Sequence, residues 1–117
     1  MSNKLILGAI SGDIIGSVFE HDNIKDVNFS LFSNNSQFTD DTVLTIATMY
    51  ALLNDLDFVS AYQKFGKLYP NRNYGAKFSS WIYSENPLPY FSYGNGSAMR
   101  VSPIGWFYDN ISDVIKI

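Results

Sequence analysis

Apolar residues recur at helical spacing along most of the chain. The first such run lies between residues 4 and 19, where apolar side chains are three and four positions apart, the period of one helix face. The run contains Leu5, Ile6, Ala9, Ile10, Ile14 and Val18. Gly8, Gly12 and Gly16 recur every fourth residue within it. Each glycine costs a helix interior about 1 kcal/mol relative to alanine, so we expect this ridge to pack closely against another helix or a ligand.

A second helix is predicted over about residues 40–53. Thr39 precedes it as a favourable N-cap, and Asp40 and Asp41 stand in its first turn, where carboxylates oppose the helix dipole. Its predicted buried face consists of Val43, Leu44, Ile46, Ala47, Tyr50 and Ala51. Between the two helices, residues 21–38 are rich in Asn, Asp and Ser but also contain aromatic residues. This mixture predicts a long ordered loop.

Shorter helices are predicted in the rest of the chain. Their expected ranges are 58–69, 75–84, 97 to about 103, and 113 onward. Asp57 caps the first of these and Pro70 ends it, while Pro103 bends or ends the third. Ser112 is the expected cap of the last. Because no segment shows convincing strand alternation, the predicted fold class is all-α, a helical bundle.

Composition and charge narrow the range of functions. The chain has 117 residues, 46% of them hydrophobic and 16% charged, which is typical of one globular domain over residues 1–117. A net charge of −3 argues against a nucleic-acid partner, which requires a basic patch. The absence of cysteine excludes disulfides and thiolate metal sites, and a single histidine, His21, excludes the common zinc sites.

The pattern of apolar residues also bears on the cellular location of the protein. No run reaches the length of about 18 apolar residues that a membrane span needs, so no membrane partner is expected. The short apolar run near residue 5 contains glycines and is followed by no convincing cleavage region. We therefore expect no signal peptide, and the cytoplasm is the predicted location.

Candidate chemistry first appears at Thr39-Asp40-Asp41-Thr42. A hydroxyl and two adjacent carboxylates are the hard oxygen ligands that Mg²⁺ and related ions prefer. An acidic protein that handles a phosphorylated ligand needs positive charge in its site, and a divalent cation supplies it. The same residue types also suit an ordinary helix start, so both interpretations stay open for this segment alone.

A second candidate is Gly94-Asn95-Gly96-Ser97, which directly precedes a predicted helix. Successive backbone N–H groups at a helix start attract an anion, which predicts a phosphate cradle. The alternative is an ordinary turn with Ser97 as the N-cap. Arg100 either adds positive charge or donates structural hydrogen bonds to buried carbonyls or to Asp13.

Aromatic residues and two further acids complete the candidates. Tyr90, Phe91 and Tyr93 lie just before the glycine-rich turn; they either stack on a purine or, for at least two of them, pack in the core. Glu20 is either a solvated surface acid or a general acid/base or ligand-clamping carboxylate. Asp13 lies within a helix that should be buried, where a carboxylate needs partners. We expect it to brace neighbouring loops by hydrogen bonds rather than to bind metal.

Taken together, these segments closely resemble the N-terminal part of ADP-ribosylglycohydrolases, including the dinitrogenase-reductase-activating glycohydrolase type. The matching segments are residues 8–16 with Glu20, Phe38-Thr39-Asp40-Asp41-Thr42, and residues 94–105. They occur in the family's order over nearly the whole chain. The resemblance implies an all-α fold with a two-metal centre of Mg²⁺ or Mn²⁺. It also implies hydrolysis of the N- or O-glycosidic bond between ADP-ribose and a protein side chain or small acceptor.

The resemblance implies roles for individual residues. Thr39, Asp40 and Asp41 would be metal ligands, and Asp40 and Asp41 would act in catalysis with Glu20, the acid near the scissile bond. Gly94, Asn95, Gly96 and Ser97 would contact the diphosphate and ribose. The metal ions would hold ribose hydroxyls and polarise the anomeric region or a bridging water. The implied partner is an ADP-ribosylated protein or a small ADP-ribosyl conjugate.

One part of the family pattern has no match in this sequence. Family members carry a second acidic cluster, Asp-x-Asp-Thr, that completes the metal site, and a His-containing segment after the Met-Arg helix; Asp109 and Asp113 lie in the wrong context to replace the cluster. We therefore expect a truncated domain, or one that a second chain completes, with exposed apolar surface. The alternative function is a non-catalytic remnant or an ADP-ribose-binding module.

Overall fold

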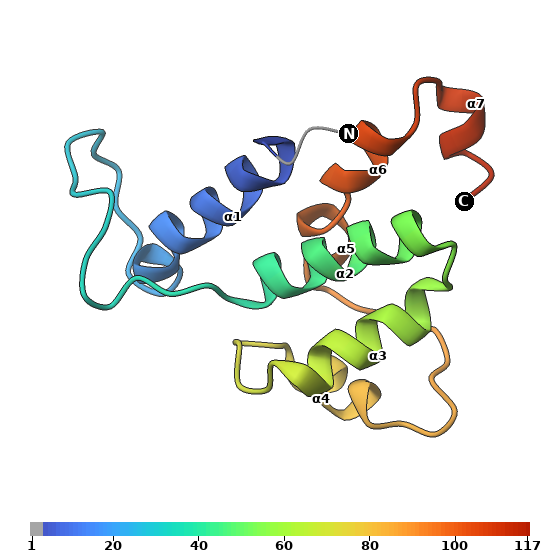
Figure 1. Cartoon of the computed structure of the whole chain (residues 1–117). Coiled ribbons are helices and arrows are strands. Elements are labelled where there is room, and N and C mark those ends of the chain that lie inside the picture. The colour runs from blue at the N-terminus through green and yellow to red at the C-terminus, as the bar shows by residue number, and fades with distance from the viewer. Residues whose placement is uncertain (1–3) are drawn as a thin grey trace.

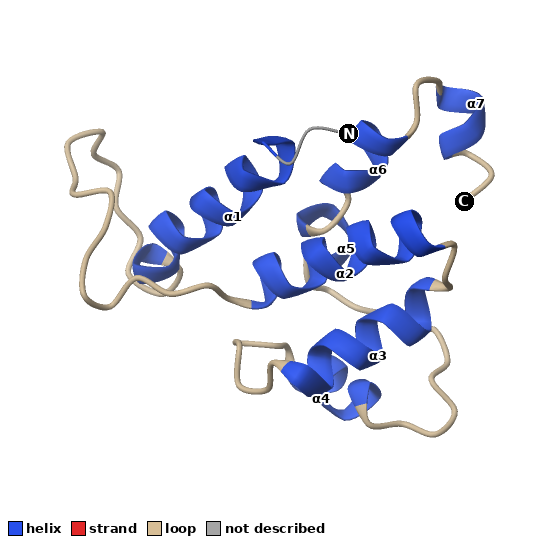
Figure 2. Ribbon diagram, in the orientation of Figure 1, coloured by secondary structure: helices blue, strands red, loops and turns tan. Residues whose placement is uncertain are grey.

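The structure is a computed structural model that describes residues 4–117, and every regular element in this range is a helix (Figures 1 and 2). The predicted all-α class is confirmed. The elements are α1 (Lys4–Gly16), the 3₁₀ turn η1 (Ser17–Phe19), α2 (Asp40–Asn54), α3 (Phe58–Leu68), α4 (Ala76–Ile82), α5 (Gly96–Met99), α6 (Ser102–Phe107) and α7 (Ile111–Val114). None of the helices described is long and apolar enough to cross a bilayer.

The central element is α2, which contacts α1, α3, α5 and α6. In Figure 1, α1 and α6 lie on one side of it, and α3 with α4 lies on the other. The fully buried apolar side chains come mostly from α2, namely Val43, Leu44, Ala47 and Ala51, with Ala61 of α3 and Ile82 of α4. Ile46 and Tyr50, which were predicted in the same face, are half-buried. The core is therefore small and centred on one helix.

Three buried threonines of α2 were not predicted as core residues. Thr42, Thr45 and Thr48 are 6%, 2% and 0% exposed, and each hydroxyl has a partner. Thr48 donates to the carbonyl of Leu44 at 2.9 Å, and its hydroxyl also lies 3.0 Å from the hydroxyl of Tyr62. Because hydrogen bonding offsets the cost of burying a hydroxyl, threonine fits this face of the helix.

Two predicted helix starts are confirmed by their caps. The Thr39 hydroxyl accepts from the Asp41 N–H at 3.3 Å, and the Asp57 carboxylate accepts from the Ser60 N–H at 2.8 Å. The predicted cap of the last helix is wrong. Asn110, rather than Ser112, caps α7, because its side-chain oxygen accepts from the Asp113 N–H at 3.0 Å.

The region around the glycine-rich turn also differs from the prediction. Asn95 is the residue before α5 and Ser97 lies inside the helix, so Ser97 is not its N-cap. The predicted break near Pro103 is present. α5 ends at Met99, and Pro103 occupies the first turn of α6, where its missing N–H is not needed.

The glycine ridge of α1 does not pack against another helix, so that half of the prediction is wrong. A Cβ built on Gly8, Gly12 or Gly16 would meet no atom within 4 Å. The close helix contact lies elsewhere. A Cβ on Gly66 of α3 would come within 2.7 Å of the Ile82 side chain of α4. Glycine at this position lets α3 and α4 approach each other.

The predicted exposed apolar surface is confirmed. Large apolar side chains that are at least half exposed occur on several elements, including Phe32, Leu53, Leu68, Leu88, Trp106, Ile111 and Ile115. Residues 21–38 form the predicted long loop without helix or strand. An edge-on contact between the Phe19 and Phe29 rings, 5.2 Å between centroids, ties this loop to the end of η1.

Candidate active site at the start of α2

Asp13 of α1 holds the first turn of α2. Its Oδ2 atom accepts from the N–H of Thr39 at 2.8 Å, and from the N–H and hydroxyl of Thr42 at 3.1 and 2.6 Å. Its Oδ1 atom accepts from the Thr39 hydroxyl at 2.6 Å. The expected role of Asp13 as a hydrogen-bonding brace is confirmed. Two backbone donors at a helix start and two nearly buried hydroxyls are satisfied by one carboxylate.

The loop between α3 and α4 fixes the same helix start from the other side. The carbonyl of Arg72 accepts from the Asp40 N–H at 2.7 Å, and the Arg72 guanidinium donates to the carbonyl of Phe38 at 3.3 Å. The guanidinium also lies 3.7 Å from the centre of the Phe38 ring. Asn71 and Asn73 on either side have left-handed backbones, with φ of 61° and 66°, which asparagine tolerates better than most residues. This contact could not be predicted from residue type, because it depends on how the loop folds back.

The two carboxylates that follow Thr39 are crowded by negative charge. Partial burial, followed by the charges of Asp41 and Glu20, raises the pKa of Asp40 to about 6. Partial burial, followed by the charges of Asp13 and Glu20, also raises the pKa of Asp41, although the Thr39 hydroxyl and Arg100 oppose the shift. The backbone N–H of Asp40 itself lowers the pKa of this carboxyl but does not offset the burial and the neighbouring charges. The start of α2 therefore presents two destabilised carboxylates.

These residues surround a hollow of about 540 Å³. Residues of the three predicted segments line it, namely Gly12, Asp13, Gly16, Glu20, Asp40, Asp41, Asn95 and Met99, together with Ser17, Phe19 and Asn23. The open face of the glycine ridge thus borders the carboxylates, which fits the second half of the prediction, an approach by a ligand. The Glu20 carboxylate accepts from the Asn73 side chain at 3.3 Å. Glu20, Asp40, Asp41 and Asn95 are brought together as expected.

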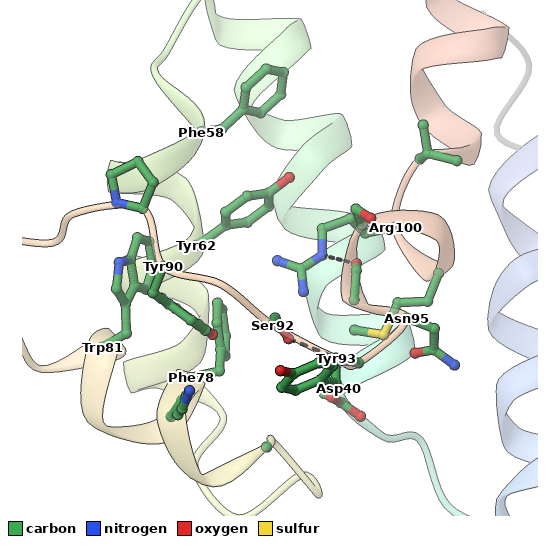
Figure 3. A pocket seen from close by; sticks show the side chains of 18 of the residues that line it. Asp40, Phe58, Tyr62, Phe78, Trp81, Tyr90, Ser92, Tyr93, Asn95 and Arg100 are labelled. Atoms are coloured by element: carbon green, nitrogen blue, oxygen red, sulfur yellow. Dashed lines mark hydrogen bonds between the residues drawn. The ribbon is translucent and has the colours of Figure 1, made fainter.

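A larger hollow of about 960 Å³ adjoins Asp40 on the other side (Figure 3). Its volume is at the upper end of the range of about 300–1,000 Å³ usual for ligand pockets. Aromatic side chains line it, among them Phe58, Tyr62, Phe78, Trp81, Tyr90 and Tyr93. Gly94, Asn95, Gly96 and Ser97 border it as well. The glycine-rich turn therefore separates the acidic hollow from an aromatic one.

The aromatic residues before the turn do not pack in the core. Tyr90 is 40% exposed, and Phe91 and Tyr93 are almost fully exposed. The expectation that at least two of them are core residues is wrong. They belong to a segment without helix that runs past α4 and borders the aromatic hollow (Figure 3). Hydrophobicity alone could not distinguish a hollow from a core.

The donor chemistry of the acidic hollow fits a divalent cation in part. Asp40 and Asp41 offer hard oxygen ligands whose like charges a cation would offset. Thr39 is only 2% exposed, and its hydroxyl hydrogen is donated to Asp13. Thr39 could therefore bind a cation only through a lone pair of its hydroxyl oxygen. Within residues 4–117 as the structure describes them, no cluster of three or more His, Cys, Asp or Glu side chains is arranged to hold a metal ion. Further oxygen ligands would have to come from outside the described residues.

Comparison with known proteins identifies the family of this chain. The sequence profile of the ADP-ribosylglycohydrolase family matches residues 4–117. The chain belongs to the ADP-ribosylglycohydrolase family. It is 31% identical to the ADP-ribosylhydrolase ARH3 of Xenopus tropicalis and 27% identical to that of Mus musculus, in each case over 95% of this chain and 40% of the relative. No solved structure matches it.

The chain spans about 40% of the length of these curated ADP-ribosylhydrolases. Within that span, the structure brings the predicted site residues of this ADP-ribosylglycohydrolase chain to two adjoining hollows. Thr39 is buried and lines neither hollow, whereas Asp40 and Asn95 line both. Arg100 donates through Nε to the carbonyl of Gly96, so of its expected roles the structure shows the structural hydrogen bond to a carbonyl. The other expected partner, Asp13, accepts from Thr39 and Thr42 instead.

Proposed function

We propose that this chain carries the N-terminal part of the active site of a metal-dependent hydrolase. The enzyme would remove ADP-ribose from a modified protein side chain or a small ADP-ribosyl conjugate by cleaving an N- or O-glycosidic bond. The observation that carries the proposal is the grouping of Glu20, Asp40 and Asp41 around one hollow, in a chain of the ADP-ribosylglycohydrolase family. The names of the matching relatives, both ADP-ribosylhydrolases, support the same class of substrate.

Asp40, Asp41 and the Thr39 hydroxyl would hold the cation, Mg²⁺ or Mn²⁺. Such an ion supplies Lewis-acid polarisation of bound oxygen atoms. Asp13 contributes indirectly, because its four hydrogen bonds set the backbone from which both carboxylates project. A brace of this kind keeps the ligands in place without the cation.

The remaining residues would bind and orient the substrate. Glu20, which Asn73 contacts at 3.3 Å, lies across the acidic hollow and would act as acid or base at the scissile bond. The backbone N–H groups of the turn at residues 94–97 would bind the diphosphate. The aromatic hollow beside this turn has the size and the ring surfaces to take a purine.

Release of ADP-ribose from an ADP-ribosylated protein in Mg²⁺ or Mn²⁺ tests the proposal. We compare the unaltered chain with Asp40→Ala/Asp41→Ala. Asp26→Ala/Asp109→Ala is the matched control, because it removes two exposed acids that line neither hollow. The proposal predicts loss of release in the first variant only. Equal release by all three proteins would remove the metal role of Asp40 and Asp41.

A second candidate is a module that binds ADP-ribose without cleaving it. Two observations favour it: the chain spans about 40% of its relatives, and its described residues form no acidic cluster of three for a metal. Calorimetry with ADP-ribose, with and without Mn²⁺, separates the cases. Tight binding without turnover supports the module, and no binding at all indicates a remnant. Turnover that appears only when a second polypeptide is added supports completion of the site by another chain.

A further inference from the structure

Arg100, directly after α5, connects the glycine-rich turn to the α3–α4 pair (Figure 3). Its Nε atom donates to the carbonyl of Gly96. The guanidinium carbon lies 4.8 Å from the centre of the Tyr62 ring on α3 and 5.1 Å from that of the Phe78 ring on α4. Cation–π attraction extends to about 6 Å, so both rings hold the side chain. The turn is thereby attached to two helices distant in sequence.

Gly96, whose carbonyl accepts the hydrogen bond, also leaves room for the Arg100 side chain. A Cβ built on Gly96 would lie 2.7 Å from Nη2 of Arg100 and 3.7 Å from its Cζ. The backbone itself does not require glycine, because no glycine in the described range has a positive φ. A Cβ at position 96 would therefore have to displace the flexible end of the Arg100 side chain, and the group that occupies this space is the guanidinium. Arg100 and Gly96 form one structural unit.

A second attachment holds the other end of α5. The hydroxyl of Thr45 on α2 donates to the carbonyl of Met99 at 3.3 Å. α5 has only four residues, too few for a stable helix without tertiary contacts. Its position beside Asp40 and Asp41 thus depends on Thr45 from one side and on Arg100 from the other.

We propose that Arg100 is a positioning residue that clamps the turn at residues 94–97 in its binding geometry. The inference rests on the proposed function in one respect, that this turn binds the diphosphate of an ADP-ribosyl ligand. Arg100 acts through the turn: it orders the backbone N–H groups before the ligand arrives, so its loss weakens affinity. Lysine cannot replace it, because an ammonium lacks the Nε–H donor and the broad planar guanidinium that lies near both rings.

The first test needs no ligand. Hydrogen exchange of the amides at residues 95–99 is measured in the unaltered chain, Arg100→Ala, Gly96→Ala and the double variant. The clamp predicts faster exchange in each single variant, by tenfold or more. It also predicts no added effect of Gly96→Ala once Arg100 is gone, because the clashing group has been removed. Equal effects of Gly96→Ala with and without Arg100 would overturn the inference.

The second test measures ADP-ribose affinity by calorimetry in saturating Mn²⁺. Arg100→Ala and Arg100→Lys are expected to raise the Kd by tenfold or more, while the Kd for Mn²⁺ alone changes less than twofold. Lys67→Ala is the matched control, because it removes an exposed positive charge that lines neither hollow. Unchanged ADP-ribose affinity in Arg100→Ala would refute the positioning role. A weakened affinity with unchanged amide exchange would make Arg100 a direct phosphate ligand instead.

The two tests distinguish failure of the clamp from failure of the proposed function. If ADP-ribose binds no variant, including the unaltered chain, the proposed function fails for this chain. The exchange experiment then still decides whether Arg100 and Gly96 act as a unit. If ADP-ribose binds and the exchange pattern is additive, the function stands and the clamp is wrong.

Discussion

Replacing Asp13 with alanine removes the acceptor of four hydrogen bonds from Thr39 and Thr42. A hydrogen bond to a charged group contributes about 1.5–3 kcal/mol. The four share one carboxylate, so they do not add fully. Thr39 and Thr42 are 2% and 6% exposed, so water cannot readily replace the lost acceptor. We expect Asp13→Ala to lower the free energy of unfolding by about 3–5 kcal/mol, the upper end for single substitutions.

Part of this loss is offset, because the Asp13 charge contributes to the raised pKa of both Asp40 and Asp41. Asp13→Asn separates the loss of the negative charge from the loss of the hydrogen-bond acceptor. It keeps the shape and one acceptor oxygen but removes the charge, so we expect a smaller loss of about 1–2 kcal/mol. A whole domain is stable by only about 5–15 kcal/mol, so Asp13→Ala should unfold in much less urea than Asp13→Asn.

Urea denaturation followed by far-UV circular dichroism measures these differences. Asp57→Ala is the matched control, since Asp57 is an exposed N-cap that accepts one bond from Ser60, so its loss should cost less than that of Asp13. Asp13→Ala is expected to be the most destabilising variant, and Asp13→Asn and Asp57→Ala are each expected to destabilise the chain less. If Asp13→Ala costs no more than Asp57→Ala, the brace does not hold the helix start.

Three further predictions concern charge, packing and surface. Because the folded pKa of Asp40 is raised from 3.8 to about 6, the metal-free folded state binds the proton more tightly than the unfolded state, and stability falls as pH rises from about 4 to 6. With a chelator at pH 8, Asp40→Asn should therefore raise the free energy of unfolding by about 1 kcal/mol, a figure reduced to allow for the partial exposure of Asp40. An equal gain at pH 4, where the Asp40 carboxyl is protonated, would contradict this. In thermal melts, Gly66→Ala should lower the free energy of unfolding by about 1–3 kcal/mol, because the new methyl group overpacks against α4. Gly8→Ala should not lower it, because a Cβ there meets nothing within 4 Å. Equal losses of stability in the two variants would refute the packing argument. The exposed apolar side chains of Trp106 and Ile115, 53% and 77% exposed, predict that the chain associates as its concentration rises. Light scattering should detect this association, and Trp106→Ser/Ile115→Ser should reduce it. A strictly monomeric unaltered chain would count against the prediction.

Local signals were enough to predict most helices and two of their caps. Capping by Thr39 and Asp57 depends on residues within three positions of the helix start, so the sequence contains the whole interaction. The same reasoning failed at α7, where Asn110 and Ser112 are both good cap residues two positions apart. Only the hydrogen bond from Asp113 to Asn110 decides between them.

The need of Asp13 for partners was predictable, but the identity of the partners was not. A carboxylate inside a helix requires donors, yet Thr39 and Thr42 lie 26 and 29 positions away and are found only in the fold. Arg72 was missed for the same reason. Its carbonyl, not its side chain, meets the Asp40 N–H, and no residue type signals a backbone acceptor.

The positions of the glycines and aromatics could not be predicted from residue type. Small size suits either a close helix contact or an open hollow, and in α1 Gly12 and Gly16 border the hollow. Tyr93 is apolar enough for a core but lies in a segment without helical period, where packing is set by distant helices. In both cases the sequence predicted a special role, and the arrangement of α1, α2 and α4 determined which.

The central claim is that Asp40 and Asp41, at the start of α2, hold a divalent cation that recruits an ADP-ribosyl ligand. The most direct test is anomalous diffraction from crystals of this chain grown with Mn²⁺. The account predicts a manganese peak within ligand distance, about 2.0–2.3 Å, of carboxylate oxygens of both aspartates. A well-ordered acidic hollow without a manganese peak, with both carboxylates hydrogen-bonded to backbone amides instead, would contradict it.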